Sequence, residues 1–267
     1  MPAFQPALFV PHGAPTFAMH PGAAGAAMTA KARTLDLPRA IIIVSAHWDT
    51  VEPTVGLASR PETIHDFWGF PEALYTIDYP ATGCREAAEE VVAALQLAGL
   101  PVTRDHGRGL DHGAWIPLRQ MFPEADVPVI PLSIQSRGGP EQAYRLGRAL
   151  SPLAGRGFLV VASGNLTHNL RDFQMVRSKA GQTPAYVREF PEWIADRLAA
   201  KDTATLFDYR RQSPGGSQAH PSDEHLLPLF VALGAGGENA RAHRFHAGID
   251  DYVLAMDAYS FTPESGV

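Results

Sequence analysis

Four of the eleven histidines lie in short turns rich in glycine, proline or tryptophan, next to apolar segments of the chain. They are His12 in PHGAP (11–15), His47 in SAHW (45–48), His168 in SGNLTHN (163–169) and His225 in HPSDEH (220–225). Neutral imidazole is a good ligand for Fe(II), Zn(II) and Mn(II), and a catalytic metal needs about three protein ligands with open positions for substrate. A single histidine of this kind is usually a surface or structural residue, but the four together predict a metal site.

The elements that must position these histidines are short, apolar runs without alternation, which are typical of strands covered on both faces. The runs are Ala7–Val10, Ala40–Val44, Val127–Leu132 and Phe158–Ala162. Helical patterns alternate with them, at Arg85–Ala98, Pro140–Leu150, Pro184–Ala200 and Ser222–Leu233. This order predicts one α/β domain over residues 1–267, with a central mixed, mostly parallel sheet flanked by helices on both faces. Because ligands bind beyond the carboxyl ends of strands in such sheets, histidines that are distant in sequence can meet there.

The helix expected at Ser222–Leu233 carries His225 beside Glu224 in its first turn. Neighbours on a helix are about 100° apart, so both side chains cannot easily face one ion. A carboxylate in a first turn also meets the positive end of the helix. We therefore expect His225 to bind metal and Glu224 to cap the helix, with Glu224 as the alternative ligand. The C-terminal segments Arg241–Phe245 and Tyr252–Tyr259 are expected to pair as antiparallel strands.

Residues 50–83 have little periodicity, several prolines and many aromatic residues, which is typical of a loop that forms a pocket wall or lid. His65 lies in this loop, and a structural role is expected for it. His112, in DHGAWIPL (111–118), has two open readings. It is either a helix-entry residue with Asp111 holding the loop, or a histidine that binds substrate or supports the metal ligands.

Composition excludes several functional classes. The chain has 267 residues, of which 45% are hydrophobic, and a net charge of −6, so it lacks the basic stripe of a nucleic-acid-binding protein. It has no apolar run of the roughly 18–20 residues that a membrane helix needs, and no signal-peptide pattern at its start, so a cytoplasmic location is expected. The single cysteine, Cys84, can form neither an internal disulfide nor a thiolate zinc site.

Six separated blocks of this sequence together resemble the LigB-type (class III) extradiol ring-cleavage dioxygenases, in particular the 4,5-DOPA extradiol dioxygenase-like branch. The blocks are PHGAP (11–15), SAHW (45–48), HDFWGFP (65–71), DHGAWIPL (111–118), SGNLTHNL (163–170) and HPSDEHLLPLFVALGA (220–235). They span nearly the whole chain in the family's order, so the resemblance is specific.

The resemblance implies a non-haem Fe(II) site with His12, His47 and His225 as metal ligands. More distant branches use a carboxylate as the third ligand, and a site of three histidines also binds Zn(II) readily. His168 matches the family's general base and acid, and could also become a fourth ligand, while His112 matches a catalytic histidine of the pocket. The implied partners are a small catechol and O2, with no nucleic acid or membrane, and the chain is expected to be a monomer or small homo-oligomer.

Two other functions can use the same histidines. A zinc hydrolase or amidase would use metal-bound water as its nucleophile, and would not need O2. A non-catalytic metal-binding or interaction protein on the same fold is the other, because fold alone does not fix function. The presence of both His112 and His168 argues against the second of these.

Overall fold

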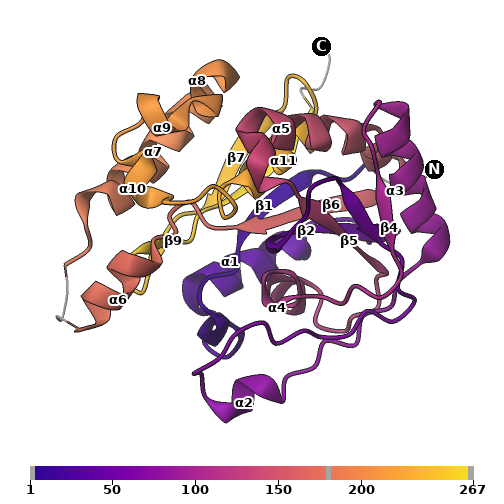
Figure 1. The fold of residues 1–267 in the computed structure, drawn as a ribbon, viewed down its shortest axis with the longest axis horizontal. Helices are drawn as coiled ribbons and strands as arrows, with labels where there is room; N and C mark the ends of the chain where they lie inside the picture. Colours follow the sequence, from indigo (N-terminus) through magenta and orange to yellow (C-terminus); the bar gives the residue numbers. More distant parts are fainter. Residues whose placement is uncertain (1–3, 179–181, 264–267) are drawn as a thin grey trace.

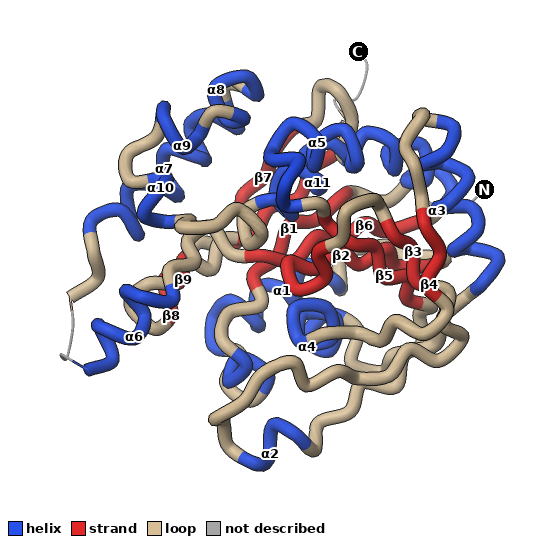
Figure 2. The backbone as a smooth tube through the Cα atoms, in the orientation of Figure 1, coloured by secondary structure: helices blue, strands red, loops and turns tan. Residues whose placement is uncertain are grey.

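The computed structural model describes residues 4–178 and 182–263, and within them eight strands form one mixed sheet in the order β4-β3-β5-β2-β6-β1-β10-β7 (Figures 1 and 2). The strands of this sheet are β1 (Ala7–Pro11), β2 (Ala40–Asp49), β3 (Thr54–Gly56), β4 (Thr103–Asp105), β5 (Val129–Ile134), β6 (Phe158–Gly164), β7 (Arg241–His246) and β10 (Ala258–Thr262). A separate two-stranded hairpin consists of β8 (Ile249–Asp250) and β9 (Leu254–Ala255).

The centre of the sheet is parallel. Strands β5, β2, β6 and β1 run in one direction, with Pro11 opposite Gly164 and Ser45 opposite Ser163. The chain therefore leaves β1, β2 and β6 at the same edge of the sheet. Strands β10 and β7 extend the sheet in the antiparallel sense. These pairings confirm the predicted mixed, mostly parallel sheet.

Helices cover both faces of the sheet, as predicted (Figure 1). Helices α1 (Gly22–Ala32) and α4 (His112–Met121) pack on one face, and α3 (Arg85–Leu97), α5 (Gly139–Leu150) and α11 (Leu227–Ala235) cover the other. The remaining helices are α2 (Glu72–Tyr75), α6 (Leu170–Ser178), α7 (Ala185–Ala199), α8 (Thr203–Phe207), α9 (Tyr209–Gln212), α10 (Gly216–Ala219) and the 3-10 turns η1 (Pro15–Ala18), η2 (Ser136–Gly138) and η3 (Ser151–Arg156). Helix α7 packs against α8, α10 and the edge strand β7. Among the residues described, no helix combines the length and hydrophobicity of a membrane span.

Most predicted elements are present, but some of their bounds and pairings differ from the prediction. The loop expected over residues 50–83 contains the strand β3 and the short helix α2, and β3 joins the sheet. The predicted C-terminal pairing is antiparallel, but its second strand is β10, and the hairpin of β8 and β9 occupies much of the segment expected to form that strand.

The helix predicted from Ser222 begins instead at Leu227. Pro228 lies in its first turn, where a missing N–H costs nothing and the fixed φ favours the helix start. The preceding residues form hydrogen-bonded turns, and the side chain of Asp223 accepts hydrogen bonds from Tyr209 and Arg210. His225 therefore lies in a turn ahead of the helix, and the helical argument that separated it from Glu224 was wrong.

Candidate metal centre

Three neighbouring strands bring the histidines of the centre to one edge of the sheet. His12 follows β1 directly, and His47 lies near the end of β2. The backbone of His225 is tied to the end of β6, because the amide of Asn165 donates to the His225 carbonyl at 2.9 Å. The sheet thus supplies the convergence that the sequence pattern predicted.

His47 differs in detail from its predicted setting. We expected a turn after Val44, but β2 continues to Asp49. The pairing of β2 with β5 shifts register between Val44 and Asp49, so an irregular stretch carries the histidine. Such bulges redirect side chains and are common beside active sites.

The Nε2 atoms of three histidines lie side by side. His47 Nε2 is 3.2 Å from His12 Nε2 and 3.3 Å from His225 Nε2. Two nitrogen ligands bound to one ion at about 2.1 Å lie about 3.0–3.4 Å apart, so this spacing suits a shared metal. His12 and His225 are buried, with 1% and 4% exposure, and His47 is partly buried.

The opposite nitrogen of each ring lies near an oxygen. His12 Nδ1 is 2.9 Å from the hydroxyl of Ser163, while His225 Nδ1 is 3.5 Å from a carboxylate oxygen of Glu224. His47 Nδ1 is 3.7 Å from Asp66. A hydrogen-bonded partner such as Ser163 fixes the ring orientation of a metal-binding histidine, whereas the contacts of His225 with Glu224 and of His47 with Asp66 are longer than hydrogen bonds. We had predicted that Glu224 caps α11, and this prediction was wrong. The helix begins later, at Leu227, and its N-cap residue makes no side-chain hydrogen bond.

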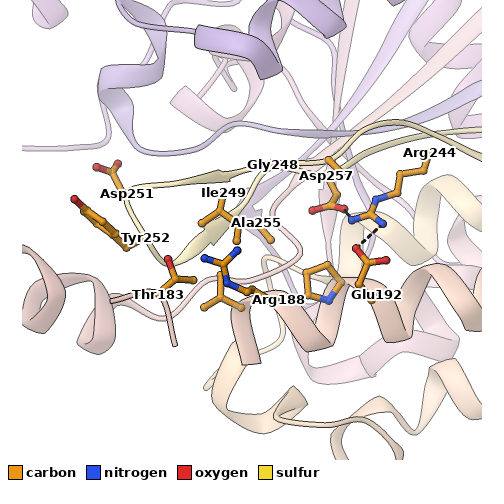
Figure 3. A pocket seen from close by; sticks show the side chains of 13 residues that line it. Thr183, Arg188, Glu192, Arg244, Gly248, Ile249, Asp251, Tyr252, Ala255 and Asp257 are labelled. Atoms are coloured by element: carbon orange, nitrogen blue, oxygen red, sulfur yellow. Dashed lines mark hydrogen bonds and ion pairs between the residues drawn. The ribbon is translucent and has the colours of Figure 1, made fainter. Parts of the chain in front are cut away.

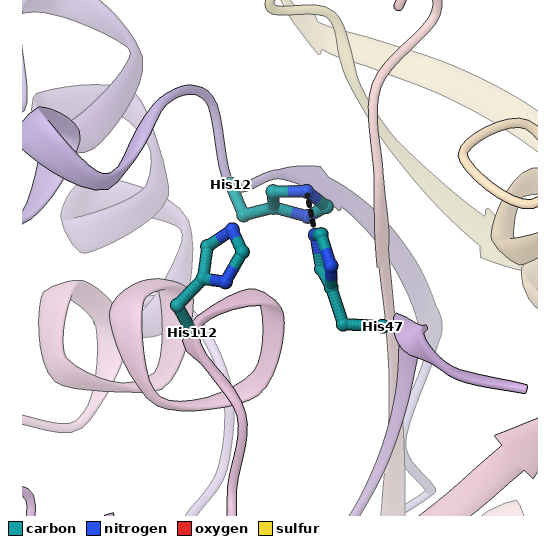
Figure 4. Close-up of side chains that lie close together, drawn as sticks. All are labelled: His12, His47 and His112. Atoms are coloured by element: carbon teal, nitrogen blue, oxygen red, sulfur yellow. Dashed lines mark hydrogen bonds between the residues drawn. The ribbon is translucent and has the colours of Figure 1, made fainter. Parts of the chain in front are cut away.

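His112 completes the cluster from the first turn of α4 (Figure 4). Ring nitrogens of His12, His47 and His112 all lie within 4.8 Å of one another, so this trio could also hold an ion. The sequence left two interpretations of His112 open, a helix-entry residue or a residue of the pocket, and features of both are present. Asp111 caps the helix by accepting from the amide of Ala114, and His112 is free to face the cluster.

His168 lies against the face of His225, with ring centroids 3.4 Å apart and planes at 4°. Its loop is held at two points. The His168 amide donates to the Ala219 carbonyl at 2.9 Å, and the buried His220 ring bonds the Leu166 carbonyl at 2.8 Å. His168 is thus placed beside the centre, and His220 supports its loop.

Burial keeps these imidazoles neutral. Desolvation is the main cause that lowers the pKa of His12 and His225 well below the usual value, and that of His47 to about 3. Burial, together with the neighbouring His112, lowers the pKa of His168 to about 4. Neutral imidazole is the form that binds metal or accepts a proton, so the cluster is ready for either at neutral pH.

Gly113 is required by the close approach of α4 to β2. A Cβ at this position would lie 2.8 Å from Cδ2 of His47 and would also collide with the hydroxyl of Ser45. That hydroxyl donates to Asp111 at 2.5 Å, which links the end of β2 to the helix cap. The glycine therefore gives His112 and His47 room to lie in one cluster.

Two residues of the centre were missed by sequence reasoning. In the sequence, Asp66 and Ser163 appeared only as members of the blocks HDFWGFP (65–71) and SGNLTHN (163–169). The sequence feature that could have identified these two residues is the position of a polar side chain in or beside a histidine-containing turn. His65 has the structural setting expected of it, because its ring contacts Phe67 and Trp115 and bonds the Ile77 carbonyl.

The remaining histidines lie outside the cluster. His20, His106 and His243 are exposed, and His246 is partly buried on β7. Cys84 is partly buried at the start of α3.

Comparison with known proteins identifies the family of this chain. The model of the family described as the catalytic LigB subunit of aromatic ring-opening dioxygenase matches residues 11–252. The chain is 39% identical to a 4,5-DOPA dioxygenase extradiol of Beta vulgaris over 226 residues, covering 84% of this chain and 83% of that protein. It is 38% identical to the protein of that name from Escherichia coli K12 over 236 residues, covering 86% and 85%.

A solved structure is also similar. The crystal structure of an uncharacterized protein from Escherichia coli K12 has a TM-score of 0.79 and 31% identity, and the match covers 96% of this chain and 99% of that one. The fold, the histidine blocks and these relatives lead to one assignment. The chain belongs to the LigB family of extradiol aromatic ring-opening dioxygenases.

Proposed function

We propose that this protein opens a DOPA-like or related catechol ring beside its diol by inserting both atoms of O2. His12, His47 and His225 would hold one divalent metal, with His168 and His112 as proton carriers. The observation that carries the proposal is the close approach of three imidazole nitrogens. The Nε2 atom of His47 lies 3.2 Å from that of His12 and 3.3 Å from that of His225. The names of the relatives, 4,5-DOPA dioxygenase extradiol, point to the substrate class.

The donor set fits a catalytic metal. Three imidazoles provide enough ligands for Fe(II) and leave positions open for other molecules. When bound, Fe(II) would supply the electron transfer that lets O2 react with a catechol. Zn(II) also suits three nitrogen donors and is a plausible bound metal, but it has no redox chemistry. We therefore expect activity with Fe(II) only.

His225 is proposed as the third ligand in preference to His112. The Nε2 of His225 lies 3.3 Å from the Nε2 of His47, and the family resemblance also assigns the third ligand position to His225. His112, whose Nδ1 bonds Asp66 and whose Nε2 stays available, is then left to contact substrate. If His112 were the ligand, its replacement would abolish metal binding and replacement of His225 would not.

The proton chemistry belongs to His168 and His112. A catechol must lose its hydroxyl protons before its ring is attacked, and a neutral imidazole can accept one. His168 is partly buried and neutral, so a ring nitrogen can take a proton from the substrate and return it when the ring opens. His112 can accept a second hydrogen bond at Nε2.

Phe67 forms the wall of the substrate slot nearest the cluster. It is buried, its ring meets His112 edge-on with centroids 5.7 Å apart, and it also contacts Tyr75. Trp68, which the sequence grouped with it, is 83% exposed and does not line a buried slot. The aromatic loop therefore limits water at the ring through Phe67.

The proposal is tested by reconstituting the protein with Fe(II) under nitrogen and offering a panel of catechols. We expect oxygen uptake, a yellow ring-opened product and two atoms of 18O per product when 18O2 is supplied. A protein that turns over amides or esters without O2 would be a zinc hydrolase instead. Cytoplasmic location, the monomer or small homo-oligomer and the absence of nucleic-acid or membrane partners stay predictions from the sequence.

A further inference from the structure

We infer that Asp66 is a positioning residue of the centre, which fixes the tautomer of His112 and the orientation of His47 through its two carboxylate oxygens. The inference rests on the proposed function for its significance, but not for its test. Asp66 lies in the loop between β3 and α2, far from both histidines in sequence.

One oxygen of Asp66 is devoted to His112. Oδ1 accepts from the His112 backbone N–H at 2.8 Å and lies 3.0 Å from the His112 Nδ1. The other oxygen, Oδ2, lies 3.7 Å from the Nδ1 of His47. This carboxylate therefore reaches two histidines of the cluster.

The contact with His112 determines where its proton lies. A carboxylate is only an acceptor, so the hydrogen bond requires a proton on Nδ1 of His112. In a neutral imidazole the other nitrogen, Nε2, then carries the lone pair. Asp66 therefore presents His112 to the cluster as an acceptor at Nε2, which is the form that can receive a substrate hydroxyl proton.

The surroundings of Asp66 favour its carboxylate form. Burial opposes ionisation of this side chain, but hydrogen bonds donated by the backbone N–H and the ring of His112 lower its pKa. The bonded amide belongs to the first residue of α4, so the positive end of that helix also faces the carboxylate.

A purely structural role would be to hold the aromatic loop. That loop has other attachments, because Trp115 Nε1 donates to the Ile64 carbonyl at 3.1 Å and Thr63 Oγ1 donates to Asp78 at 2.7 Å. Asp78 contacts the loop but no histidine of the centre, so Asp78→Asn is a matched control. It weakens a loop contact and leaves both histidines untouched.

The test uses two replacements of Asp66. Asp66→Ala removes both contacts. Asp66→Asn keeps an oxygen that can accept from His112, but presents an amide that cannot accept from Nδ1–H of His47. The isosteric asparagine variant also keeps the test open if the alanine variant does not fold.

The first measurement is the tautomer of His112 in the metal-free, 15N-histidine-labelled protein. Long-range 1H–15N correlation reports which ring nitrogen carries the proton, and the His112 signals are those lost in His112→Gln. We expect Nδ1–H in the wild type, Asp66→Asn and Asp78→Asn, and a mixture or Nε2–H in Asp66→Ala. An unchanged His112 tautomer in folded Asp66→Ala overturns the inference.

The second measurement is Zn(II) affinity by competition with a chromophoric chelator. Loss of the outer partner of a metal-bound histidine typically weakens binding about 10–100-fold, so we expect that range for Asp66→Ala and Asp66→Asn and less than about twofold for Asp78→Asn. Equal losses in Asp66→Asn and Asp78→Asn would reduce Asp66 to a loop contact. Neither measurement uses O2 or a catechol. Failure of ring cleavage would therefore contradict the proposed function, whereas the role of Asp66 is tested independently by the tautomer and the Zn(II) affinity.

Discussion

The histidine centre and the cavity between α7 and the C-terminal hairpin are two polar regions of opposite design (Figures 3 and 4). The cavity has a volume of about 610 Å³. Opposite charges meet there, because Arg244 bonds Glu192 at 2.8 Å and also pairs with Asp257. At the centre, neutral ring nitrogens face each other at 3.2 and 3.3 Å.

The two regions indicate that converging nitrogen ligands, and not empty volume, mark the chemistry of the molecule. In the cavity, opposite charges are paired, because Arg244 contacts both Glu192 and Asp257. The imidazoles of the centre have lone pairs that converge on one another, which is favourable only when a cation or a proton lies among them. Each prediction below tests whether the two regions differ in this way.

The largest effect is expected for His47→Ala. The Nε2 atom of His47 lies between those of His12 and His225. Loss of a residue that only supports a ligand weakens metal binding about 10–100-fold, so loss of His47 itself should weaken it more and should abolish oxygen uptake. Competition with a chelator measures the affinity. Retention of stoichiometric, tight metal by this variant would exclude the proposed ligand set.

His168→Ala should separate metal binding from catalysis. General acid–base catalysis contributes about 10²–10⁴-fold, so we expect the ring-cleavage rate to fall by that factor with metal content unchanged. Single-turnover kinetics and metal analysis on the same sample give both quantities. Wild-type turnover in this variant would remove His168 from the proton chemistry, and loss of metal would make it a ligand.

Gly113→Ala probes the packing of the centre. Alanine favours a helix by about 1 kcal/mol relative to glycine, so a surface position would gain stability. Here the added methyl meets His47 and Ser45. We expect about tenfold weaker metal binding, within the range for disturbed outer contacts. A variant that is more stable and binds metal normally would show that the close approach is unimportant.

Acid stability should depend on His220, which supports the catalytic loop. Burial lowers its pKa to about 3 in the folded protein, whereas the unfolded chain binds the proton near pH 6.5. Because the unfolded state then binds more protons, the free energy of unfolding falls as the pH drops from 6.5 toward 3. His220→Gln should reduce this slope by about 1.4 kcal/mol per pH unit in the metal-free protein, measured by urea unfolding. An unaltered slope would mean that His220 is charged in the fold.

The smallest effect on metal binding at the centre is expected from a substitution in the cavity. Arg244→Met leaves Asp257, which is 1% exposed, without its positive partner. Breaking a buried ion pair costs about 3 kcal/mol or more, so the free energy of unfolding should fall by about that amount. Metal affinity should stay within about twofold. A large loss of metal would show that the two regions are coupled.

The sequence predicted the parts of this molecule that depend on local pattern. Unalternated apolar runs identified β1, β2, β5 and β6, and the parallel arrangement of such runs brings His12, His47 and His168 to one edge. Short elements were missed, since β3 and β4 have three residues each and are stabilised by the sheet they join. Local propensity carries little signal at that length.

Long-range contacts explain the remaining errors at the site. The end of β2 is irregular where its pairing with β5 shifts register and where its residues Ser45 and His47 lie close to Gly113 of α4. No local sequence pattern encodes these contacts. The start of α11 depends on Pro228, which outweighed the polar residues we took for a cap. Asp66 reaches His112 across 46 positions of sequence, and only the folded chain brings them together.

The most direct test of the metal centre is a crystal structure of the protein loaded with Fe(II) under nitrogen. The account predicts one ion bound by Nε2 of His12, His47 and His225 at about 2.0–2.3 Å, with His112 outside bonding distance. An ion held by His112 in place of His225, or bound away from these three rings, would contradict it.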